Sequence, residues 1–285
     1  MGNSPTRLRM PSRASGIVSL ACAILFTGCA AHGPARNGEK IHRGLSYSKN
    51  GGSSQYVDLY VPASRKPCPV VVWYHGGSWK YGHPGFHLLL RDLTDHGFAV
   101  ASVKYRLLGR THRWPAQLED SLAAVDWVYA NGHRYGIDAS RLGVSGESAG
   151  GHLAALVALR VGRPRIDAAC VLYPPTDMVE LGRRYAHFHR FSVVTQMFRG
   201  DIENRLDQAR AASPLTYVSR NAPPFLIIHG DRDWLVPPDQ SRHLHRALKK
   251  AGAESHLDIV KGKGHAFALD DGQLDEVAHF FRRRL

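Results

Sequence analysis

Ser148 has the sequence setting of a nucleophile. It is the central residue of Gly-Glu-Ser-Ala-Gly at 146–150, between a short apolar run over 142–145 and an amphipathic run over 152–161. A strand, a sharp turn and a helix in this order form a nucleophile elbow, whose glycines avoid clashes in the tight turn. The helix start also directs free N–H groups and a positive dipole end toward the serine. The pattern predicts a reactive hydroxyl, and a glycine-rich turn with a solvated serine is the alternative.

A loop with two glycines could stabilise the negative charge that such a hydroxyl creates. Residues 69–74 read Pro-Val-Val-Val-Trp-Tyr, which is typical of a buried strand, and they lead directly into His-Gly-Gly-Ser-Trp at 75–79. Glycines let backbone N–H groups approach a ligand closely. We therefore expect an oxyanion hole built from Gly76, Gly77 and the residue after the serine, Ala149. An ordinary turn at a strand end is the alternative.

A base and two possible acids follow later strands. Residues 224–229 predict a buried strand that ends shortly before Asp231 and Asp233, and residues 256–260 predict a strand that leads to His265. The carboxyl ends of parallel strands meet at one edge of a sheet, so these groups could meet Ser148 there. His265 would take the serine proton and return it to a leaving group, while a carboxylate fixes the imidazole tautomer.

These motifs, with others, resemble one enzyme family from about residue 46 to the C-terminus. The chain is similar to bacterial α/β-hydrolase esterases, close to the hormone-sensitive-lipase-like group and its feruloyl- and acetyl-xylan-esterase-like branch. The motifs that carry the resemblance are His75-Gly76-Gly77-x-Trp79, Tyr105-Arg106-Leu107, Trp114-Pro115-Ala116 with Asp120 and Trp127, Tyr135-Gly136-Ile137-Asp138, Gly146-x-Ser148-x-Gly150-Gly151-His152, His229-Gly230-x-x-Asp233-x-x-Val236-Pro237 and Gly264-His265-x-Phe267.

The resemblance implies a serine carboxylesterase that hydrolyses short-chain acyl esters of small molecules through an acyl-enzyme. It implies Ser148, Asp233 and His265 as the triad, because Asp233 stands three residues before Val-Pro as the family acid does; Asp231 is the competitor. Ser78 stands where hormone-sensitive-lipase-like enzymes carry a third glycine, and it fits a His-Gly-Gly-x-Trp variant found in arylformamidases and some methylesterases. An arylformamidase or another amide hydrolase is therefore the alternative activity.

A binding protein of the same fold without catalysis is a further alternative, although such proteins tend to lose a triad residue and all three are present here. No cofactor is implied, and no spacing of cysteines and histidines predicts a zinc site. Cys68 and Cys170 lie beside different predicted strands and are expected to be separate thiols. The sequence does not indicate an oligomeric state.

The spacing of apolar runs predicts an α/β-hydrolase fold with a mostly parallel, eight-stranded sheet and helices on both faces. A length of 285 residues suits one such domain. One helix is predicted after Pro115, with its buried face at Leu118, Leu122, Val125 and Tyr129. The strands are expected to begin near Ile41, Tyr56, Pro69, Phe98, Arg141, Ala168, Pro224 and His256.

A long insertion over 176–213 separates two of these strands and carries several aromatic residues. Connections of this length often carry function. We expect a small cap over Ser148 that shapes the substrate pocket. An ordinary crossover helix with one buried face is the alternative.

The N-terminus resembles an export signal. Arg7, Arg9 and Arg13 precede an apolar run over 16–26, and Thr-Gly-Cys follows at 27–29. Small residues before a cysteine resemble the cleavage site of bacterial lipoproteins. We therefore expect a signal peptide over 1–28, lipidation of Cys29, a flexible tether over 29–40 and a hydrolase domain over 41–285. Secretion without lipid, into the periplasm or the medium, is the alternative to a membrane lipoprotein of the cell envelope.

The formal net charge is +13, and removal of the three leader arginines lowers it to +10. The positive charge is spread along the chain, with local clusters at 249–250 and 282–284. A basic face could lie near an anionic membrane or an acidic polysaccharide. Nucleic acid is not an expected partner, because no nucleic-acid-binding motif is present and export excludes it.

Overall fold

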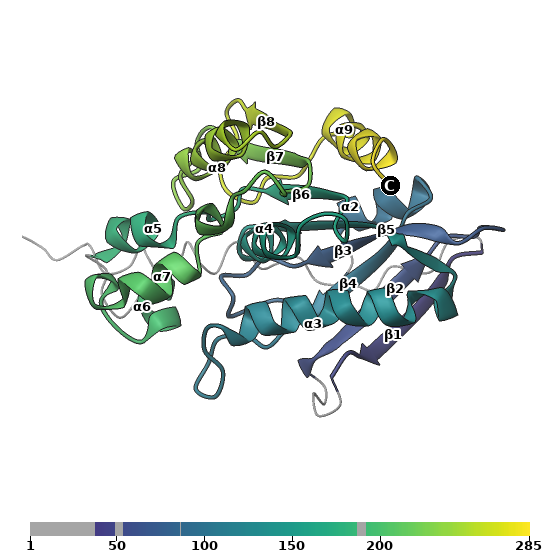
Figure 1. Ribbon diagram of the computed structural model, residues 1–285, viewed down its shortest axis with the longest axis horizontal. Coiled ribbons are helices and arrows are strands. Elements are labelled where there is room, and N and C mark those ends of the chain that lie inside the picture. The colour runs from purple at the N-terminus through teal and green to yellow at the C-terminus, as the bar shows by residue number, and fades with distance from the viewer. Residues whose placement is uncertain (1–37, 49–53, 86, 187–191) are drawn as a thin grey trace, which may run out of the picture. The chain divides into compact units, whose positions relative to one another are not determined.

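A single sheet has the strand order β1-β2-β4-β3-β5-β6-β7-β8 (Figure 1). The computed structural model describes residues 38–48, 54–85, 87–186 and 192–285, and these statements concern that part of the chain. β1 pairs antiparallel with β2, β2 pairs antiparallel with β4, and all later pairings are parallel. The predicted mostly parallel, eight-stranded fold is confirmed. The strands are β1 (Lys40–Ser46), β2 (Tyr56–Val61), β3 (Cys68–Tyr74), β4 (Ala99–Lys104), β5 (Ile137–Glu147), β6 (Ala168–Leu172), β7 (Phe225–Gly230) and β8 (Ser255–Val260).

β5 begins earlier than the sequence predicted. It starts at Ile137, which pairs with Cys68, and the register against β3 then shifts before Leu142 pairs with Val70. The expected start near Arg141 marks the point where regular pairing resumes. The register shift interrupts the apolar pattern by which a strand is recognised. The sequence therefore predicted only the second part of β5.

Helices cover both faces of the sheet. Residues of β3 alternate between them: Val70, Val72 and Tyr74 pack on the face of α3, α4 and α8, whereas Val71 and Trp73 pack on the face of α2 and α9. The helices are α2 (Leu88–Asp95), α3 (Ala116–Asn131), α4 (Ala149–Val161), α5 (Met178–Arg184), α6 (Val193–Phe198), α7 (Leu206–Ala211), α8 (Asp239–Lys250) and α9 (Asp271–Arg282), with short 3₁₀ segments η3 (Gly132–Tyr135), η5 (Ile202–Arg205) and η6 (Pro214–Tyr217).

Helix α4 is buried all round, not amphipathic as predicted. Every residue from Ala149 to Leu159 is buried, because the helix packs against β3, β5 and β6 on one side and against α3 and η6 on the other. A helix that is apolar on all faces belongs in a core. The alanines and glycines of this helix allow neighbouring elements to approach closely, which the hydropathy of the segment did not indicate.

Helix α3 is present where the sequence predicted it, but its buried face differs. Leu118 and Val125 are buried as expected, whereas Tyr129 is 51% exposed. The Arg165 guanidinium lies 4.7 Å from the centre of the Tyr129 ring, so a cation–π contact holds this tyrosine on the surface.

The insertion over 176–213 forms three short helices, α5, α6 and α7, together with η5 (Figure 1). It is not a single crossover helix. Its apolar residues Met197, Phe198 and Ile202 are buried and pack within the main core cluster, while Phe188 and Phe191 lie outside the described residues. The expected signal peptide, Cys29 and most of the tether also lie outside them. Among the described residues, no helix has both the length and the apolar character needed to cross a membrane.

Cys68 and Cys170 are both free and buried, on β3 and β6, so the prediction of separate thiols is confirmed.

Candidate active site

The segment around Ser148 is a strained turn between β5 and α4. Ser148 has φ 51° and ψ −118°, a backbone conformation that non-glycine residues rarely adopt. Neither Gly146 nor Gly150 has room for a side chain, because a Cβ on either would collide with the carbonyl oxygen of Tyr74 on β3. The two glycines therefore let the turn close against the central strand, and Ser148 is presented at the carboxyl edge of the sheet.

Ser148 and His265 are in direct contact. The Ser148 Oγ lies 2.9 Å from His265 Nε2, and His265 Nδ1 lies 2.6 Å from Asp233 Oδ2. The carboxylate fixes the proton on Nδ1, so Nε2 is left to accept the hydrogen bond from the serine hydroxyl. The structure thus brings the three residues predicted for the triad into one hydrogen-bonded chain.

Asp233 is held as an ionised acceptor. Its Oδ1 receives the backbone N–H groups of Leu235 and Val236 at 2.9 and 2.8 Å, and Oδ2 receives His265 and His229. Burial alone would raise the pKa of Asp233, but the hydrogen bonds from the two histidines and the Val236 N–H outweigh it and lower the pKa to about 2. Asp233 is therefore charged at neutral pH.

Asp231 is exposed and has a different contact. Its Oδ1 accepts the backbone N–H of Gly262 at 2.6 Å, which joins the loop after β7 to the turn after β8. The geometry therefore favours Asp233 over Asp231 as the partner of His265.

His229 has a place in the site that sequence reasoning did not assign, although the residue was part of a matched motif. It is fully buried at the end of β7, and its Nε2 lies 2.8 Å from the Val236 carbonyl and 3.2 Å from Asp233 Oδ2. Two acceptors at Nε2 place the proton there, so the Ser241 hydroxyl donates to Nδ1 at 2.6 Å. This contact orients the histidine from helix α8.

The loop after β3 has three successive residues with positive φ: Gly77 (113°), Ser78 (53°) and Trp79 (58°). Its Trp79 is fixed at both ends, because the carbonyl accepts the Leu108 N–H at 2.7 Å and the indole N–H donates to His152 Nδ1 at 3.1 Å. His152 Nε2 in turn donates to the Ala212 carbonyl at 2.7 Å. Burial lowers the pKa of His152 to about 4, so it stays neutral and keeps both contacts.

The Glu147 side chain, next to the nucleophile in the chain, packs against Gly76 of the loop after β3. Its carboxylate receives the Tyr173 hydroxyl at 2.7 Å and lies 3.3 Å from His87 Nε2. Burial would raise the pKa of Glu147, but these contacts lower it to about 2. Gly76, Gly77 and Ala149 remain the predicted donors of the oxyanion hole. The Ala149 N–H, at the first helical position, has no acceptor within its own helix.

Tyr173 supports the base, and it does not line an open pocket. It is 2% exposed, and its ring meets the His265 ring edge to face with the centroids 4.9 Å apart. Trp79 is equally buried. Both residues therefore lie behind the site.

His75 is the first residue of the loop after β3, and Tyr105, the first residue of the segment after β4, holds it in place. Its ring stacks on Tyr105 with centroids 4.4 Å apart, and the Tyr105 hydroxyl donates to the His75 carbonyl at 2.8 Å. Burial lowers the pKa of His75 to about 4.

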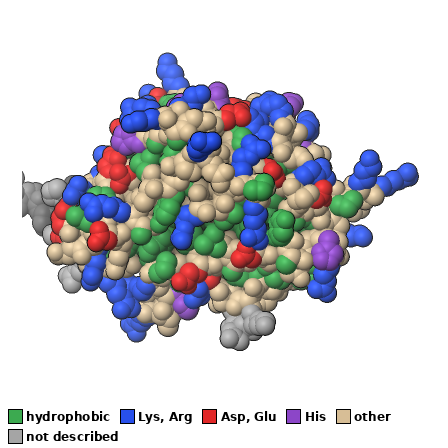
Figure 2. Space-filling model, in the orientation of Figure 1, with side chains coloured by type: hydrophobic (Ala, Val, Ile, Leu, Met, Phe, Trp, Pro, Cys, Tyr) green, Lys and Arg blue, Asp and Glu red, His purple; other side chains and the backbone are tan. Residues whose placement is uncertain are grey.

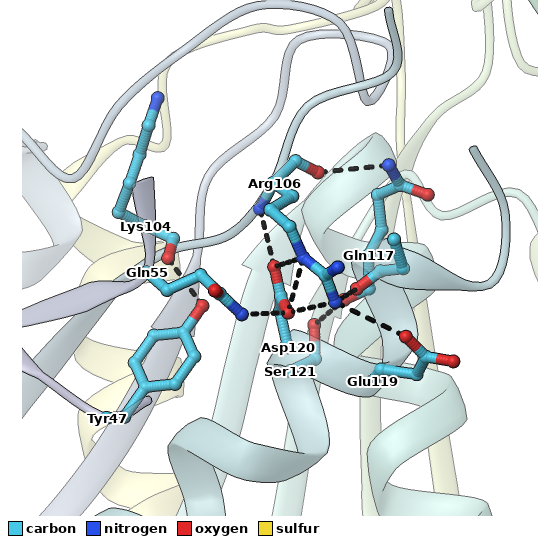
Figure 3. A network of polar contacts seen from close by, with 9 residues as sticks. Tyr47, Gln55, Lys104, Arg106, Gln117, Glu119, Asp120 and Ser121 are labelled. Carbon is cyan, nitrogen blue, oxygen red and sulfur yellow. Dashed lines mark hydrogen bonds and ion pairs between the residues drawn. The ribbon is translucent and has the colours of Figure 1, made fainter. Parts of the chain in front are cut away.

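The next residue after Tyr105, Arg106, anchors that segment to helix α3 (Figure 3). Arg106 contacts both oxygens of the buried Asp120 through its side chain, and its backbone N–H donates to the same carboxylate at 2.7 Å. Gln55 adds a further hydrogen bond to Asp120 at 2.6 Å. Figure 3 shows these groups converging on one carboxylate, so this family motif has a structural role in holding the site.

The insertion contacts both loops of the site. Lys80 Nζ and Arg113 Nη1 donate to Gln196 of α6 at 2.7 and 3.0 Å, and the Tyr185 hydroxyl donates to the carbonyl of Leu235 at 2.6 Å. The insertion therefore lies at the carboxyl edge of the sheet, beside the loop after β3 and the loop that carries Asp233. Its role in shaping a pocket stays a prediction.

No group of three or more His, Cys, Asp or Glu side chains in the described part of the chain is arranged to hold a metal ion.

The sheet order, the elbow and the serine–histidine–aspartate chain define the α/β-hydrolase class of proteins. Residues 57–248 match the BD-FAE family, and the chain belongs to it. The predicted family resemblance is thereby confirmed.

Curated relatives of this chain are esterases. Esterase LipC of Mycobacterium tuberculosis is 34% identical over 227 residues, which cover 73% of this chain and 55% of LipC. Esterase LipQ of the same organism is 31% identical over 77% of this chain and 56% of its own length. The chain therefore spans about half the length of the curated relatives it matches.

One solved structure is similar to this chain over nearly its own full length. A truncated form of a carbohydrate esterase from gut microbiota superposes with a TM-score of 0.80 and 25% identity, over 88% of this chain and 98% of that one.

Proposed function

We propose that this protein is a serine carboxylesterase that hydrolyses short-chain acyl esters through an acyl-enzyme intermediate. The observation that carries the proposal is the hydrogen-bonded chain from Ser148 through His265 to Asp233, at 2.9 and 2.6 Å. The names of the relatives and of the similar structure support ester hydrolysis as the reaction class.

In the first half-reaction, Ser148 Oγ attacks the ester carbonyl carbon while His265 Nε2 takes the hydroxyl proton. Negative charge develops on the carbonyl oxygen, where the N–H groups of Gly76, Gly77 and Ala149 and the start of α4 would stabilise it. The intermediate collapses when the bond to the alcohol oxygen breaks and His265 returns its proton to that oxygen. Asp233, charged at neutral pH, stabilises the imidazolium between these steps.

In the second half-reaction, water attacks the acyl carbon and His265 takes the proton of the water. Collapse releases the carboxylic acid and restores the Ser148 hydroxyl, to which His265 gives back the proton. The strained φ of 51° at Ser148 presents its hydroxyl at the turn between β5 and α4, where it serves both steps.

The proposal is tested with the chain from residue 30 onward and a panel of substrates. The panel contains p-nitrophenyl esters from acetyl to palmitoyl, feruloyl and acetyl-xylan esters, and N-formylkynurenine. We expect short-chain esters to be hydrolysed and Ser148→Ala to lower kcat/KM at least ~10³-fold, because triad residues act as a unit. Ser140→Ala, an exposed serine on the same strand, is the matched control and keeps activity.

The same panel separates the other activities. Preference for N-formylkynurenine would establish a formamidase instead of an esterase. Failure of every substrate, together with failure of a fluorophosphonate probe to label Ser148, would point to a binding protein. The Ser148→Ala variant is checked for folding by circular dichroism. If the folded variant keeps more than a tenth of wild-type activity, Ser148 is not the nucleophile.

We also propose that the protein is a lipoprotein of the bacterial cell envelope, attached through Cys29. The basic leader, the short apolar run over 16–26 and Thr-Gly before Cys29 support this proposal. Two or more acyl chains are needed for stable anchoring, and lipidation of an N-terminal cysteine would supply them.

A further inference from the structure

One end of the hydrolase domain carries a concentration of exposed lysines and arginines. The parallel strands β3 to β8 all begin at this end, which is opposite to Ser148, and the helices that precede them end there. In Figure 2, Lys and Arg side chains project from the right-hand end of the domain, where these strands begin in Figure 1. This basic pole consists of the exposed residues Lys40, Arg65, Lys66, Arg134, Arg163, Arg220, Lys249, Lys250, Arg282 and Arg283.

Acidic residues at the same end balance little of this charge. Asp95 and Glu254 are exposed there, whereas Asp138 is paired with Arg141 at 2.7 Å. The opposite end differs, because arginines of the insertion alternate with acids, as in the pairs Arg183–Glu203 and Arg210–Asp207. The positive charge of the domain is therefore distributed unevenly, and its excess lies at the end opposite to the catalytic edge.

A hollow of about 410 Å³ opens within the basic pole. Three arginines line it together with Asp167, Glu254 and Pro224. Arg284 is held by Glu254 in an ion pair, so the exposed Arg163 and Arg283 are the guanidinium groups that an incoming anion would meet. Guanidinium groups bind phosphate oxygens through paired N–H donors, and a phosphate group fits a hollow of this size.

The chain enters the domain at the same pole. β1 is antiparallel to β2, and β2 is antiparallel to β4, so β1 runs in the same direction as β4 and begins at the pole with Lys40. Eight residues lie between Cys29 and Gly38, and the nine steps of a fully extended chain between the two reach at most about 30 Å. A lipid on Cys29 would therefore keep this pole close to the bilayer.

We propose that the basic pole is a docking surface for anionic phospholipid headgroups, with a headgroup phosphate bound in the hollow between Arg163 and Arg283. Charge complementarity and the position of the tether carry this proposal, and only the tether argument rests on the proposed lipid anchor. Contacts of this kind are screened by salt over a distance of about 8 Å at physiological ionic strength, so docking is weakened at high salt.

The test uses the chain from residue 30 onward, which contains every described contact and no anchor. Cosedimentation is measured with two kinds of vesicle: phosphatidylglycerol and phosphatidylcholine mixed at about 30:70, and pure phosphatidylcholine. We expect binding to the anionic vesicles alone, and at least a tenfold loss of affinity in the triple variant Arg163→Gln, Arg282→Gln, Arg283→Gln.

The matched control removes the same charge from the other end, in the triple variant Arg110→Gln, Arg199→Gln, Arg205→Gln. These arginines are exposed in the loop after β4 and in the insertion. We expect near wild-type vesicle binding from this control, and unchanged hydrolysis of p-nitrophenyl acetate from the variant of the basic pole.

Equal losses in the two variants would mean that net charge alone drives binding and would overturn the proposal. Binding to phosphatidylcholine alone would also overturn it, as would tighter binding of the acidic polysaccharide polygalacturonate through the same arginines. Lipid labelling of Cys29 is measured separately, so loss of the anchor proposal leaves the vesicle result interpretable.

Discussion

His229 and His265 share one oxygen of Asp233. His265 Nδ1 lies 2.6 Å from Oδ2 and His229 Nε2 lies 3.2 Å from the same atom, while Oδ1 is occupied by two backbone N–H groups. The hydrogen-bonded chain therefore extends beyond the triad, from Ser148 to Ser241. A carboxylate held on all sides in this way has one orientation, and so has the imidazole that depends on it.

We predict that His229 is a positioning residue for Asp233. Asn at position 229 places its amide near the position of Nδ1 and loses the donor to Asp233, whereas Gln can place its amide near Nε2. His229→Asn should lower kcat about tenfold, the equivalent of about 1.4 kcal/mol, with little change in KM, because the lost hydrogen bond goes to a charged group. His229→Gln should restore most of the rate.

The comparison is made by steady-state kinetics with p-nitrophenyl butyrate and by urea unfolding. A purely structural role would lower the stability of the two variants without separating their kcat values, and that outcome would remove His229 from the catalytic description.

Asp233→Asn should reduce kcat by up to ~10⁴-fold, because an amide cannot hold the His265 tautomer that accepts the serine proton. Asp231→Asn is the matched control two residues away, exposed and bonded to the Gly262 N–H. It should keep activity within a few-fold of wild type. Kinetics of the two purified variants decide the assignment, and a larger effect at Asp231 would reverse it.

Acid should destabilise the fold in two stages. Burial lowers the pKa of His75 and His152 to about 4, below the value of about 6.5 in an unfolded chain. Between about pH 6.5 and pH 4 the unfolded state therefore binds more protons than the folded state. The free energy of unfolding falls as the pH is lowered through this range. Glu147 and Asp233, with pKa values of about 2, add a second loss below about pH 4.5.

Urea unfolding from pH 7 to pH 4 measures the first stage. Each histidine accounts for a loss of up to about 3 kcal/mol, at 1.36 kcal/mol per pKa unit. His152→Gln can keep the contacts to Trp79 and Ala212 without titrating, so its stability should fall less over this range. Parallel curves for the two proteins would show that His152 is not one of the titrating groups.

Short acyl chains should be preferred. Among the described residues of the insertion, Met197, Phe198 and Ile202 are buried in the core, so these three side chains offer no open apolar surface to a long chain. A methylene that fits a pocket contributes up to ~0.8 kcal/mol, whereas one that stays in water contributes nothing. We expect kcat/KM to peak at acetyl to butyryl esters and to fall beyond about six to eight carbons, a range that the ester panel covers. A maximum at dodecanoyl, with activation at a lipid–water interface, would indicate a lipase.

Cys29→Ser should abolish lipid attachment. In cells fed an alkyne palmitate analogue, the wild-type chain should be labelled and shortened, whereas the serine variant should remain unlabelled and unprocessed. Cys22→Ser, a change within the same apolar run, is the control and should be labelled normally. Labelling that persists in Cys29→Ser would reject this anchor.

Much of the fold was predictable because its central strands are uninterrupted apolar runs. The run over 69–74 became β3 within one residue, and the elbow motif placed Ser148 correctly because the glycines on either side have no room for a side chain. Strand order predicted that Ser148, His265 and one of two aspartates would meet, since parallel strands end at one edge, and the family resemblance selected Asp233 over Asp231. Here the local pattern and the global fold required the same residues.

Contacts made by variable or weakly patterned residues were not predictable. Glu147 is the unspecified position of the elbow motif, and nothing in the sequence indicated that its carboxylate accepts the Tyr173 hydroxyl. His152 lies in helix α4, and nothing in the sequence indicated that its ring joins the Trp79 indole to the Ala212 carbonyl. Such contacts join segments far apart in the sequence, and their geometry exists only after the sheet has formed.

The length of β5 sets how far the active site lies from the pole where the chain enters. Its paired stretch from Ile137 to Gly146 runs alongside Cys68 to Tyr74 of β3, a span of about 20 Å at the usual rise of a strand, because the register shift takes up the extra residues of β5. This is about two thirds of the thickness of the hydrocarbon core of a bilayer. A domain docked through its basic pole would hold Ser148 too far from the membrane for the acyl chains of its lipids to reach. Its substrates would then come from the surrounding water, as soluble esters or as acyl groups on external polymers.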